Sequence, residues 1–461
     1  MFVCIVLFGG HFALCARANF TETTSIESFL RDNFSNTNAG MVIALLDEHG
    51  AKIFKAGKLD NGTGQEVNAD TLFEIGSITK TFTALLALDM QKRGELNLND
   101  PVVKYLPPSV KVPSYSKQII LLNLAVQDSG LPFNATNFIG ANDEEHYDSY
   151  TADRMYAFLS GYALKAPPGA QFQYSNVGMS LLGHALERIS HTNFESLVLA
   201  RICRPLHMTD TYVKLPPALK PRMAVGHDDK GKRAPDFALQ VMAPAGALHS
   251  TVNDMLKYLA AEIGLTNSPL SPLMKDSQVI RHIDSPDFGK TAMPWVDQHV
   301  FNPPGTELLG HGGGTLGSTA FIGFDKLQRR GVVVLTNQRY CHAPSVGWTI
   351  LQGLSLTKEN FTQMVLEIAG IGAALGVDQQ TQLLQITKVF PASPAFSAGL
   401  TNGILIQKIN EQSTIGKTPD ACAQLIRGPV GSKVRLEIIN PTSNETNTVE
   451  ITRQKFTTSN G

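Results

Sequence analysis

The 461-residue sequence lacks several features that would each define a class of protein. Its 39 Lys and Arg residues nearly balance 40 Asp and Glu residues, so the net charge is −1. A balanced charge argues against the basic surfaces that bind nucleic acids or anionic membranes. The composition, 43% hydrophobic and 17% charged, excludes a disordered or collagen-like chain. The length favours two or three domains.

Cysteine is scarce, with five residues in the chain. Two lie within the first 15 residues, which leaves Cys203, Cys341 and Cys422. No pair has the spacing of a zinc site, and three cysteines form at most one disulfide. A phosphate-binding loop and a His-Glu-x-x-His motif are also absent. We therefore expect buried free thiols, no metal and no cofactor.

Long hydrophobic runs are rare, and the clearest one opens the chain. Residues 1–15 are largely apolar, and Ala16-Arg17-Ala18 has the small-x-small pattern that signal peptidase requires. No basic residue precedes the apolar run, and a buried N-terminal helix is the alternative. The run is too short for a good membrane span. We predict a signal peptide at 1–18 and a secreted or periplasmic protein without an integral membrane span.

Apolar runs separated by polar turns predict two β-hairpins. They lie at residues 41–46 with 51–54 and at 319–324 with 331–336. Helices are expected at 25–34 and from 73–77 to about Arg93, the second with one apolar face. Helical patterns dominate from about 97 to 261. Strands at both ends of a helical middle predict an α+β unit with a helical insertion.

A different module follows a break in the pattern near residues 355–361. Its predicted elements are strands at 385–389, 404–409, 433–439 and 448–452 and a helix at 418–427. This length is sufficient for a small complete domain. We therefore predict one domain over residues 19–357 and a second over residues 362–461.

Ser77-x-x-Lys80 places a hydroxyl at the start of a helix and an amine three residues later. Residues i and i+3 share a helix face, so Lys80 can reach the Ser77 oxygen. A serine nucleophile needs an adjacent base, and a desolvated lysine can be one. The signal is weak alone because the same spacing recurs at Ser114 with Lys117 and at Ser355 with Lys358.

Two later segments add to this signal. In Tyr174-Ser175-Asn176 a tyrosine beside a cation can carry a proton, and the amide can bind a substrate amide or carbonyl. The alternative is a tyrosine that only caps the following helix. The glycines of His311-Gly312-Gly313-Gly314 can admit a substrate to a strand edge, or they form a flexible loop. A lipase oxyanion loop is excluded because the chain has no Gly-x-Ser-x-Gly pentapeptide.

In this order, the three motifs resemble the serine β-lactamase and penicillin-binding-protein superfamily. The closest branch is the class C-like group of DD-carboxypeptidases, esterases and D-aminopeptidases. Further phrases carry the resemblance: 73–77, 99–107, Ser129-Gly130-Leu131-Pro132, 167–169, 205–210 and 245–250. The resemblance covers about residues 23–356. It implies an antiparallel β-lactamase/transpeptidase-like sheet flanked by helices and an acyl-enzyme reaction on amides or esters.

The resemblance also implies roles for single residues. The catalytic group would be Ser77 as nucleophile, Lys80 as base and Tyr174 as proton relay. Substrate would be bound by Asn176, His311, Gly313 and Gly314, with the N–H groups of Ser77 and Gly314 as the oxyanion hole. His311 stands where many β-lactamases carry lysine, which favours ester or D-peptide cleavage over β-lactam hydrolysis. Two departures leave the substrate open: Gln127-Asp128 replaces His-Thr, and Gly312 replaces Thr.

The C-terminal module resembles a PDZ domain of the bacterial protease type. The resemblance rests on Gly370-Ile371-Gly372, 391–395, Ala398-Gly399-Leu400 and Ile409-Asn410. It implies that Gly370, Ile371 and Gly372 capture the carboxylate of a peptide C-terminus and that the peptide adds as a strand. Gly403-Ile404 departs from the usual Gly-Asp at a surface turn. The alternative is a small β domain that only packs on its neighbour.

Together these observations predict an exported serine hydrolase with, at most, weak β-lactamase activity. Its partners would be a small-molecule or peptide substrate and a peptide C-terminus, with no nucleic acid. The alternative is a non-catalytic penicillin-binding-like scaffold that acts through the C-terminal module. Ester turnover that is lost in Lys80→Ala would exclude the scaffold.

Overall fold

The computed structural model describes most of the chain between Thr23 and Gln454. The residues outside the description are 1–22, 36, 139–148, 229–230, 236, 238, 286–288, 298–304, 340, 358–370, 379, 391–392, 416, 418–421, 423–424, 427–431, 442, 444 and 455–461. The predicted signal peptide therefore lies outside the described residues. No helix among those described is long and apolar enough to cross a membrane.

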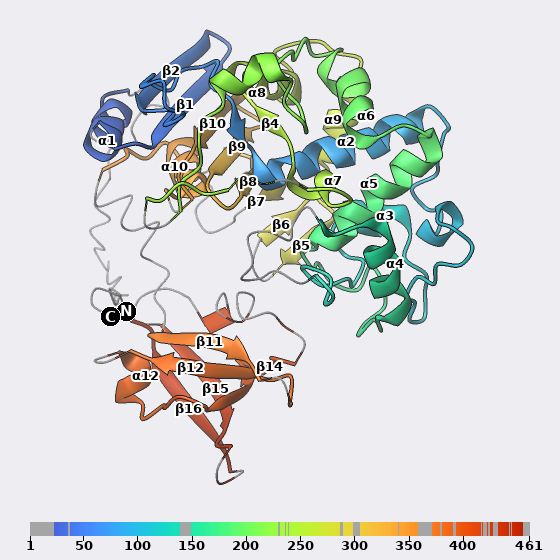
Figure 1. Ribbon diagram of the computed structural model, residues 1–461, viewed down its shortest axis with the longest axis vertical. Coiled ribbons are helices and arrows are strands. Elements are labelled where there is room, and N and C mark those ends of the chain that lie inside the picture. The colour runs from blue at the N-terminus through green and yellow to red at the C-terminus, as the bar shows by residue number, and fades with distance from the viewer. Residues whose placement is uncertain are drawn as a thin grey trace, which may run out of the picture.

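An eight-stranded antiparallel sheet forms the centre of the larger part of the molecule (Figure 1). Its order is β2-β1-β10-β9-β8-β7-β6-β5. Both predicted hairpins are confirmed, as β1 (Gly40–Asp47) with β2 (Gly50–Gly57) and β9 (Thr319–Asp325) with β10 (Arg330–Thr336). Strand β1 pairs with β10, with Ile43 opposite Val334, so the two ends of this unit meet in one sheet.

The sheet buries both faces, which explains why its central strands are almost continuously apolar. Successive side chains of a strand point to opposite faces. In β1, Met41, Ile43 and Leu45 join one core cluster, and Val42, Ala44 and Leu46 join the other. The first cluster also contains residues of α1 (Thr24–Phe34) and α10 (Ala343–Leu351). The second contains residues of the helical middle.

The helical middle is confirmed, and β4 (His249–Ser250) is its one described strand between residues 97 and 261. Its α-helices are α3 (Leu121–Ala125), α4 (Ala152–Gly161), α5 (Asn176–Ser190), α6 (Phe194–Val198), α7 (Ala243–Gly246) and α8 (Val252–Glu262), followed by α9 (Ser271–Ser277). Shorter turns are the 3₁₀ helices η2 (Val102–Tyr105) and η5 (Pro217–Arg222) and the π-helical turn η4 (Leu199–Cys203).

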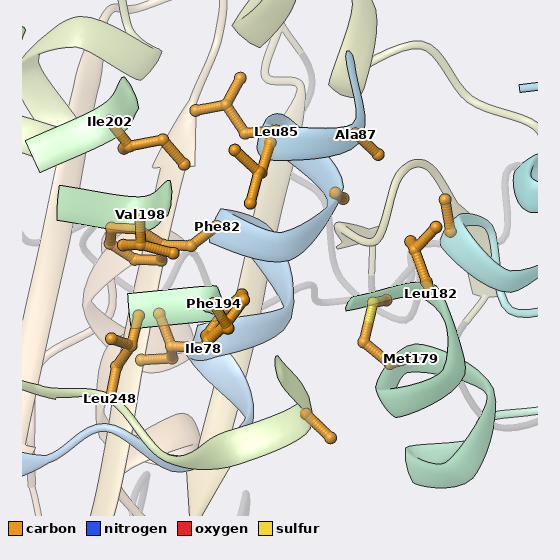
Figure 2. Close-up of a cluster of buried hydrophobic side chains, with 14 of the residues drawn as sticks. Ile78, Phe82, Leu85, Ala87, Met179, Leu182, Phe194, Val198, Ile202 and Leu248 are labelled. Atoms are coloured by element: carbon orange, nitrogen blue, oxygen red, sulfur yellow. The ribbon is translucent and has the colours of Figure 1, made fainter. Parts of the chain in front are cut away.

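The helix expected from residues 73–77 to Arg93 begins later than predicted. The chain first forms β3 (Phe73–Glu74), then the 3₁₀ turn η1 (Gly76–Ile78), and then α2 (Thr79–Lys92). The expectation of a single apolar face is also corrected, because α2 is buried from Thr79 to Met90. Apolar side chains surround it: Figure 2 shows Ile78, Phe82 and Leu85 beside Phe194, Val198, Ile202 and Leu248.

The glycine-rich segment at 311–314 is a strand rather than a loop before one. It forms the end of β8 (Leu308–Gly314), which pairs along its length with β9. On its other side β8 pairs with β7 (Val296–Asp297) through Gly310 and Val296. Three further strands were not predicted from the sequence: β5 (His282–Ser285), β6 (Gly289–Thr291) and β7. They are short and irregularly paired.

A second sheet lies in the C-terminal part of the chain, with the order β11-β12-β13-β15-β16 and β14 paired to β13. The four predicted strands are present as β12 (Leu384–Val389), β13 (Leu405–Ile409), β15 (Lys433–Ile439) and β16 (Thr446–Thr452). The others are β11 (Ala373–Val377), β14 (Gln412–Ser413) and the short helix α12 (Pro394–Ser397). Of the predicted helix 418–427, only Cys422, Leu425 and Ile426 are described. This sheet has its own apolar core.

Candidate active site

Ser77 lies in η1, in a turn that glycine makes possible. The preceding Gly76 has φ +51, and a Cβ atom there would lie 2.6 Å from the backbone nitrogen of Gly314. Such a distance leaves no room for a side chain, and positive φ is costly for other residues. Because η1 lies directly against β8, Ser77 is held between the buried helix α2 and the glycine-rich strand.

Lys80 lies one turn further on and is fully buried. Its Nζ donates a hydrogen bond to Ser77 Oγ at 2.9 Å and another to the carbonyl of Ala245 at 2.6 Å. Burial holds the pKa of Lys80 well below its usual range, because a charged amine is poorly solvated there. The lower pKa favours the neutral amine, which can accept a proton. The contact expected from the Ser-x-x-Lys spacing is present.

Tyr174 comes from a distant part of the chain, just before α5. A side-chain hydrogen bond joins it to Ser77, and Lys80 Nζ lies 4.9 Å from the centre of its ring. Burial raises the pKa of Tyr174, although the hydrogen bond with Ser77 acts in the opposite direction. The hydroxyl therefore keeps its proton. Tyr174 does not cap α5, because Ser175 Oγ accepts the Gly178 N–H at 2.8 Å and fills that role.

His311 lies on β8 with 4% of its surface exposed, and its ring centre is 6.4 Å from that of Tyr174. Burial, together with nearby Lys80, lowers the pKa of His311 to about 3, although a hydrogen bond with Gly312 opposes the shift. Its Nδ1 lies 2.7 Å from the carbonyl oxygen of Gly312. The imidazole is therefore neutral near pH 7.

Gly313 and Gly314 let β8 approach Ser77. A Cβ atom at Gly313 would lie 2.0 Å from the carbonyl oxygen of Ile75 and 3.3 Å from the nitrogen of Ser77. Beyond Gly310, the edge of β8 faces η1 and has no strand partner among the described residues. A substrate carbonyl placed at this edge would lie beside the backbone of both segments.

Asn176 is the first residue of α5, and its Nδ2 donates to Asn134 Oδ1 at 3.1 Å. Neither Asn134 nor Phe133 was identified from the sequence. The ring of Phe133 stacks on Tyr174 with centres 5.9 Å apart, and 43% of its surface is exposed. Both follow directly after the Ser129–Pro132 phrase, so extending that phrase by two residues would have found them.

Metal binding and thiol chemistry have less support in the described part of the chain. It contains no group of three or more His, Cys, Asp or Glu side chains that could hold a metal ion. Cys203, Cys341 and Cys422 are free thiols, as expected, and the first and last are buried. Cys341 is only partly buried, yet the desolvation of its thiol raises the pKa to about 12, so this thiol is protonated near neutrality.

The second predicted site lies at the start of β11, and its Gly370 is outside the described residues. Ile371 is buried, and its carbonyl accepts the Ala395 N–H at 2.7 Å. Gly372 has φ +72, and its carbonyl accepts the Phe390 N–H at 3.1 Å. The N–H groups of Ile371 and Gly372 form no hydrogen bond with a described residue. Strand β11 is an edge strand of its sheet.

The sequence of the larger unit matches a known protein family. The family model described as Beta-lactamase matches residues 30–354, which is most of the chain. The protein belongs to the β-lactamase family. The C-terminal sheet lies beyond this match, so its likeness to a PDZ domain stays a prediction.

Curated relatives of the chain include two kinds of enzyme. It is 31% identical over 222 residues to the D-alanyl-D-alanine-carboxypeptidase/endopeptidase AmpH of Escherichia coli K12, a match that covers 48% of this chain and 56% of that protein. It is 24% identical over 330 residues to a β-lactamase of Lysobacter lactamgenus, covering 65% and 82%. The chain thus spans little more than half the length of the first relative.

Solved structures support the fold. The β-lactamase/D-alanine carboxypeptidase of Pseudomonas syringae aligns with a TM-score of 0.61 at 22% identity, covering 72% of this chain and 97% of that one. A class C β-lactamase from Rhodobacter sphaeroides gives 0.60 at 22% identity, covering 74% and 98%. The expected β-lactamase-like fold is confirmed.

Proposed function

We propose that the protein is an exported serine hydrolase that cleaves esters and amides through an acyl-enzyme on Ser77. One observation carries the proposal: a fully buried Lys80 amine donates a hydrogen bond to Ser77 Oγ over 2.9 Å. Burial keeps the pKa of this amine low, and its second hydrogen bond to Ala245 fixes its position. A serine activated by an adjacent neutral amine is a nucleophile.

In the first half of the reaction, Ser77 Oγ attacks the substrate carbonyl carbon and its proton passes to Lys80 Nζ. The carbonyl oxygen becomes an oxyanion, for which the N–H groups of Ser77 and Gly314 are the proposed donors. Collapse of this intermediate breaks the bond to the leaving atom, which receives a proton from the Tyr174 hydroxyl. Lys80 then reprotonates Tyr174, so the amine is neutral again.

In the second half, a water molecule attacks the acyl-enzyme ester. Its proton is taken up by Lys80, directly or through Tyr174, and Ser77 Oγ leaves with a proton returned from the same pair. The product is the free carboxylic acid, and the enzyme regains its starting protonation state. The protonated phenol of Tyr174 suits a relay rather than a primary base, because burial raises its pKa.

We expect esters or peptides with D-residues to be better substrates than β-lactams. The support is His311, which is buried and neutral, so no fixed cation from this side chain pairs with a β-lactam carboxylate. The carboxypeptidase name of the AmpH relative agrees with this preference. Because other relatives are named β-lactamases, the proposal also includes weak β-lactam hydrolysis.

Intact mass after exposure to a fluorophosphonate or a fluorescent penicillin tests the proposal. We expect one adduct on the wild-type protein and none on Ser77→Ala. Ser114→Ala is the matched control, because Ser114 has the same Ser-x-x-Lys spacing but is exposed. A wild-type protein without an adduct, or an adduct that persists in Ser77→Ala, contradicts the proposal. Ester turnover lost in Lys80→Ala excludes the non-catalytic scaffold.

Export rests on the leader alone, residues 1–18. If the leader directs export, protein recovered from the periplasm or medium begins at Asn19, and its intact mass shows the loss of 18 residues. Recovery only from the cytoplasm with the leader attached would remove this part of the proposal.

For the C-terminal sheet we propose binding of a peptide C-terminus at residues 370–372. The supporting features are the edge strand β11 and the N–H groups of Ile371 and Gly372, which bond to no described residue. An extended peptide could add to this edge and place its carboxylate at those groups. Fluorescence anisotropy with a labelled peptide ending in an apolar residue tests it. Equal binding of the amidated peptide would contradict carboxylate capture.

A further inference from the structure

The segment that carries Tyr174 is fastened on both sides by one residue, Gln127. The backbone carbonyl of Gln127 accepts the Gln173 N–H at 2.6 Å. Its side-chain Oε1 accepts the Ser175 N–H, also at 2.6 Å. Gln127 therefore holds the residue before Tyr174 with its main chain and the residue after it with its side chain.

Gln127 pays a conformational cost to make both bonds. Its φ is +63, in the left-handed region that residues with a side chain seldom adopt, and only 1% of its surface is exposed. Strain of this kind persists where the surroundings impose it, often near functional sites. Its Nε2 is buried and has no hydrogen-bond partner among the described residues. The side-chain amide of Gln127 therefore forms its hydrogen bond through the oxygen and not through the nitrogen.

The next residue, Asp128, keeps Gln127 in place. Its carboxylate accepts a hydrogen bond from Asn123 Nδ2 at 2.8 Å and lies 3.1 Å from Nε2 of His282 on β5. Its backbone N–H donates to the Asn123 carbonyl at 3.0 Å, and its carbonyl accepts the Gly169 N–H at 2.8 Å. The strained residue is therefore followed by one fixed through main chain and side chain together.

From this geometry we propose that Gln127 is a positioning residue for proton transfer: its Oε1 holds the Tyr174 hydroxyl where it can protonate the leaving atom. The inference rests on the proposed function, because it needs Tyr174 to be the relay. It goes beyond that function because the dipeptide Gln127-Asp128 departs from the His-Thr of the resembled family. A displacement of about 1 Å at a relay costs up to ~100-fold in rate.

The dependence of rate on the leaving group separates positioning from a general structural effect. Ring-substituted phenyl acetates, from p-nitrophenyl to p-methoxyphenyl, form the same acetyl-enzyme and differ little in size. A p-nitrophenolate leaves without a proton, whereas a p-methoxyphenolate benefits from one. The ratio of kcat/KM for these two esters therefore reports proton delivery during acylation. General loosening or a lower active fraction would reduce both values equally.

Gln127→Met keeps the size of the side chain and removes Oε1. We expect the ratio of kcat/KM for the p-nitrophenyl ester to kcat/KM for the p-methoxyphenyl ester to rise about tenfold, a part of the roughly 10²–10⁴-fold that general acid catalysis contributes. Gln127→Asn is the second variant, because Asn tolerates positive φ and is too short to keep the bond to Ser175. It should raise the ratio in the same direction. Either variant suffices if the other fails to fold.

Gln352→Met is the matched control. Gln352 is also a buried glutamine, at the end of α10, and its Oε1 has no hydrogen-bond partner among the described residues. In Gln352→Met the ratio of kcat/KM for the p-nitrophenyl and p-methoxyphenyl esters should equal that of the wild type. A folded Gln127 variant with an unchanged ratio overturns the inference, even if its overall rate is lower. Failure of the wild type to hydrolyse any of these esters contradicts the proposed function, and the inference with it.

Discussion

Two regions of the molecule place glycine beside a strand edge, and they differ in what surrounds that edge. At β8, Gly313 lies so close to Ile75 that a Cβ atom would be 2.0 Å from its carbonyl oxygen. At β11, a Cβ atom at Gly376 would meet Thr387 Cγ2 at 2.8 Å, a side-chain atom of the neighbouring strand. The first contact is with backbone across the unpaired edge of β8, whereas the second is with a side chain of β12, the strand with which β11 pairs.

The polar groups near the two edges differ in the same way. Beside β8 lie a buried amine, Lys80, a partly buried phenol, Tyr174, and a buried neutral imidazole, His311. Among the described residues of the C-terminal part, the buried ionisable groups are the Cys422 thiol, whose pKa burial raises to about 11, and Arg453, whose guanidinium donates to the carbonyls of Ile426 and Lys433. A strand edge thus becomes a reactive site through the titratable groups buried beside it, and without them it can only bind.

The largest expected effect comes from removing the buried amine. Lys80→Met should lower kcat/KM for p-nitrophenyl acetate by about 10³-fold, because Ser77 loses its base. In the wild type, the neutral amine is the active form. The rate should therefore fall as pH drops through the lowered pKa of Lys80 and stay level above it. Stopped-flow or steady-state rates across pH measure both effects.

The control for this variant lies in the C-terminal sheet. Lys408→Met removes a lysine of β13 whose Nζ forms an ion pair with Glu437 at 3.1 Å. Its rate and pH profile should match the wild type. If Lys80→Met and Lys408→Met lowered the rate to a similar extent, the loss would not depend on the buried amine beside Ser77, and the proposed difference between the two regions would be wrong.

The glycines themselves give the next largest effect. In Gly313→Ala the new methyl group would collide with the Ile75 carbonyl, which belongs to the backbone and cannot rotate away. Displacing the donors of an oxyanion hole costs about 10²-fold in kcat. Gly376→Ala meets only a Thr387 methyl group and should leave ester turnover unchanged. Equal activity of the two variants would contradict the close packing of β8 on η1.

Part of this arrangement could be predicted from the sequence because its causes are local. Apolar runs around polar turns predicted the hairpins β1–β2 and β9–β10, and the i, i+3 spacing predicted the contact of Lys80 with Ser77. The strand at 308–314 was not predicted, because glycine has no side chain to favour a strand. It is a strand because β9 pairs with it along its length.

The parts that could not be predicted depend on partners far away in the chain. Gln127 and Ser175 are 48 residues apart, and Asn134 and Asn176 are 42 apart. No periodicity marks such pairs. The charge of His311 depends on burial, which a sequence does not show at a single position. The sequence therefore predicted the candidate catalytic residues, but it did not predict the residues that hold them in place.

Replacing the neutral imidazole by a cation would sharpen the difference between an ester site and a β-lactam site. His311→Lys should raise kcat/KM for nitrocefin relative to p-nitrophenyl acetate by about tenfold, because an ammonium can pair with the β-lactam carboxylate. His311→Gln is the neutral control and should leave the ratio unchanged. If wild-type nitrocefin turnover already exceeds that of every ester and peptide, the substrate preference proposed here is wrong.

A buried acid distinguishes the stability of the two regions. Burial raises the pKa of Glu262, at the end of α8, to about 8, although its hydrogen bond with Gln278 opposes this. The folded unit therefore binds a proton that the unfolded chain releases near the ordinary glutamate pKa of 4.5. The contribution of Glu262 to stability is full below this value and is lost as pH rises through about 8.

Glu262→Gln removes this proton and should flatten the pH dependence. Its Tm should be close to the wild-type value near pH 4.5 and about 5 °C higher near pH 8. Among the described residues, the acids of the C-terminal sheet are not buried, so a matched Glu437→Gln variant should show no such trend. Parallel melting curves for wild type and Glu262→Gln at all pH values would contradict this prediction.

The smallest effect is expected from removing the C-terminal sheet altogether. Its apolar core is separate from the two clusters that surround the large sheet, and Ser77, Lys80, Tyr174 and His311 all precede it. A protein that ends at Thr357 loses the hydrogen bond from Lys165 Nζ to the Ile415 carbonyl, at an exposed position. Its kcat/KM for p-nitrophenyl acetate should stay within about twofold of the full chain, because surface contacts of this kind contribute little. Binding of C-terminal peptides should disappear. If the shortened protein folds, as shown by circular dichroism and a cooperative melt, yet hydrolyses no ester, the second edge is part of the first site and the division between them fails.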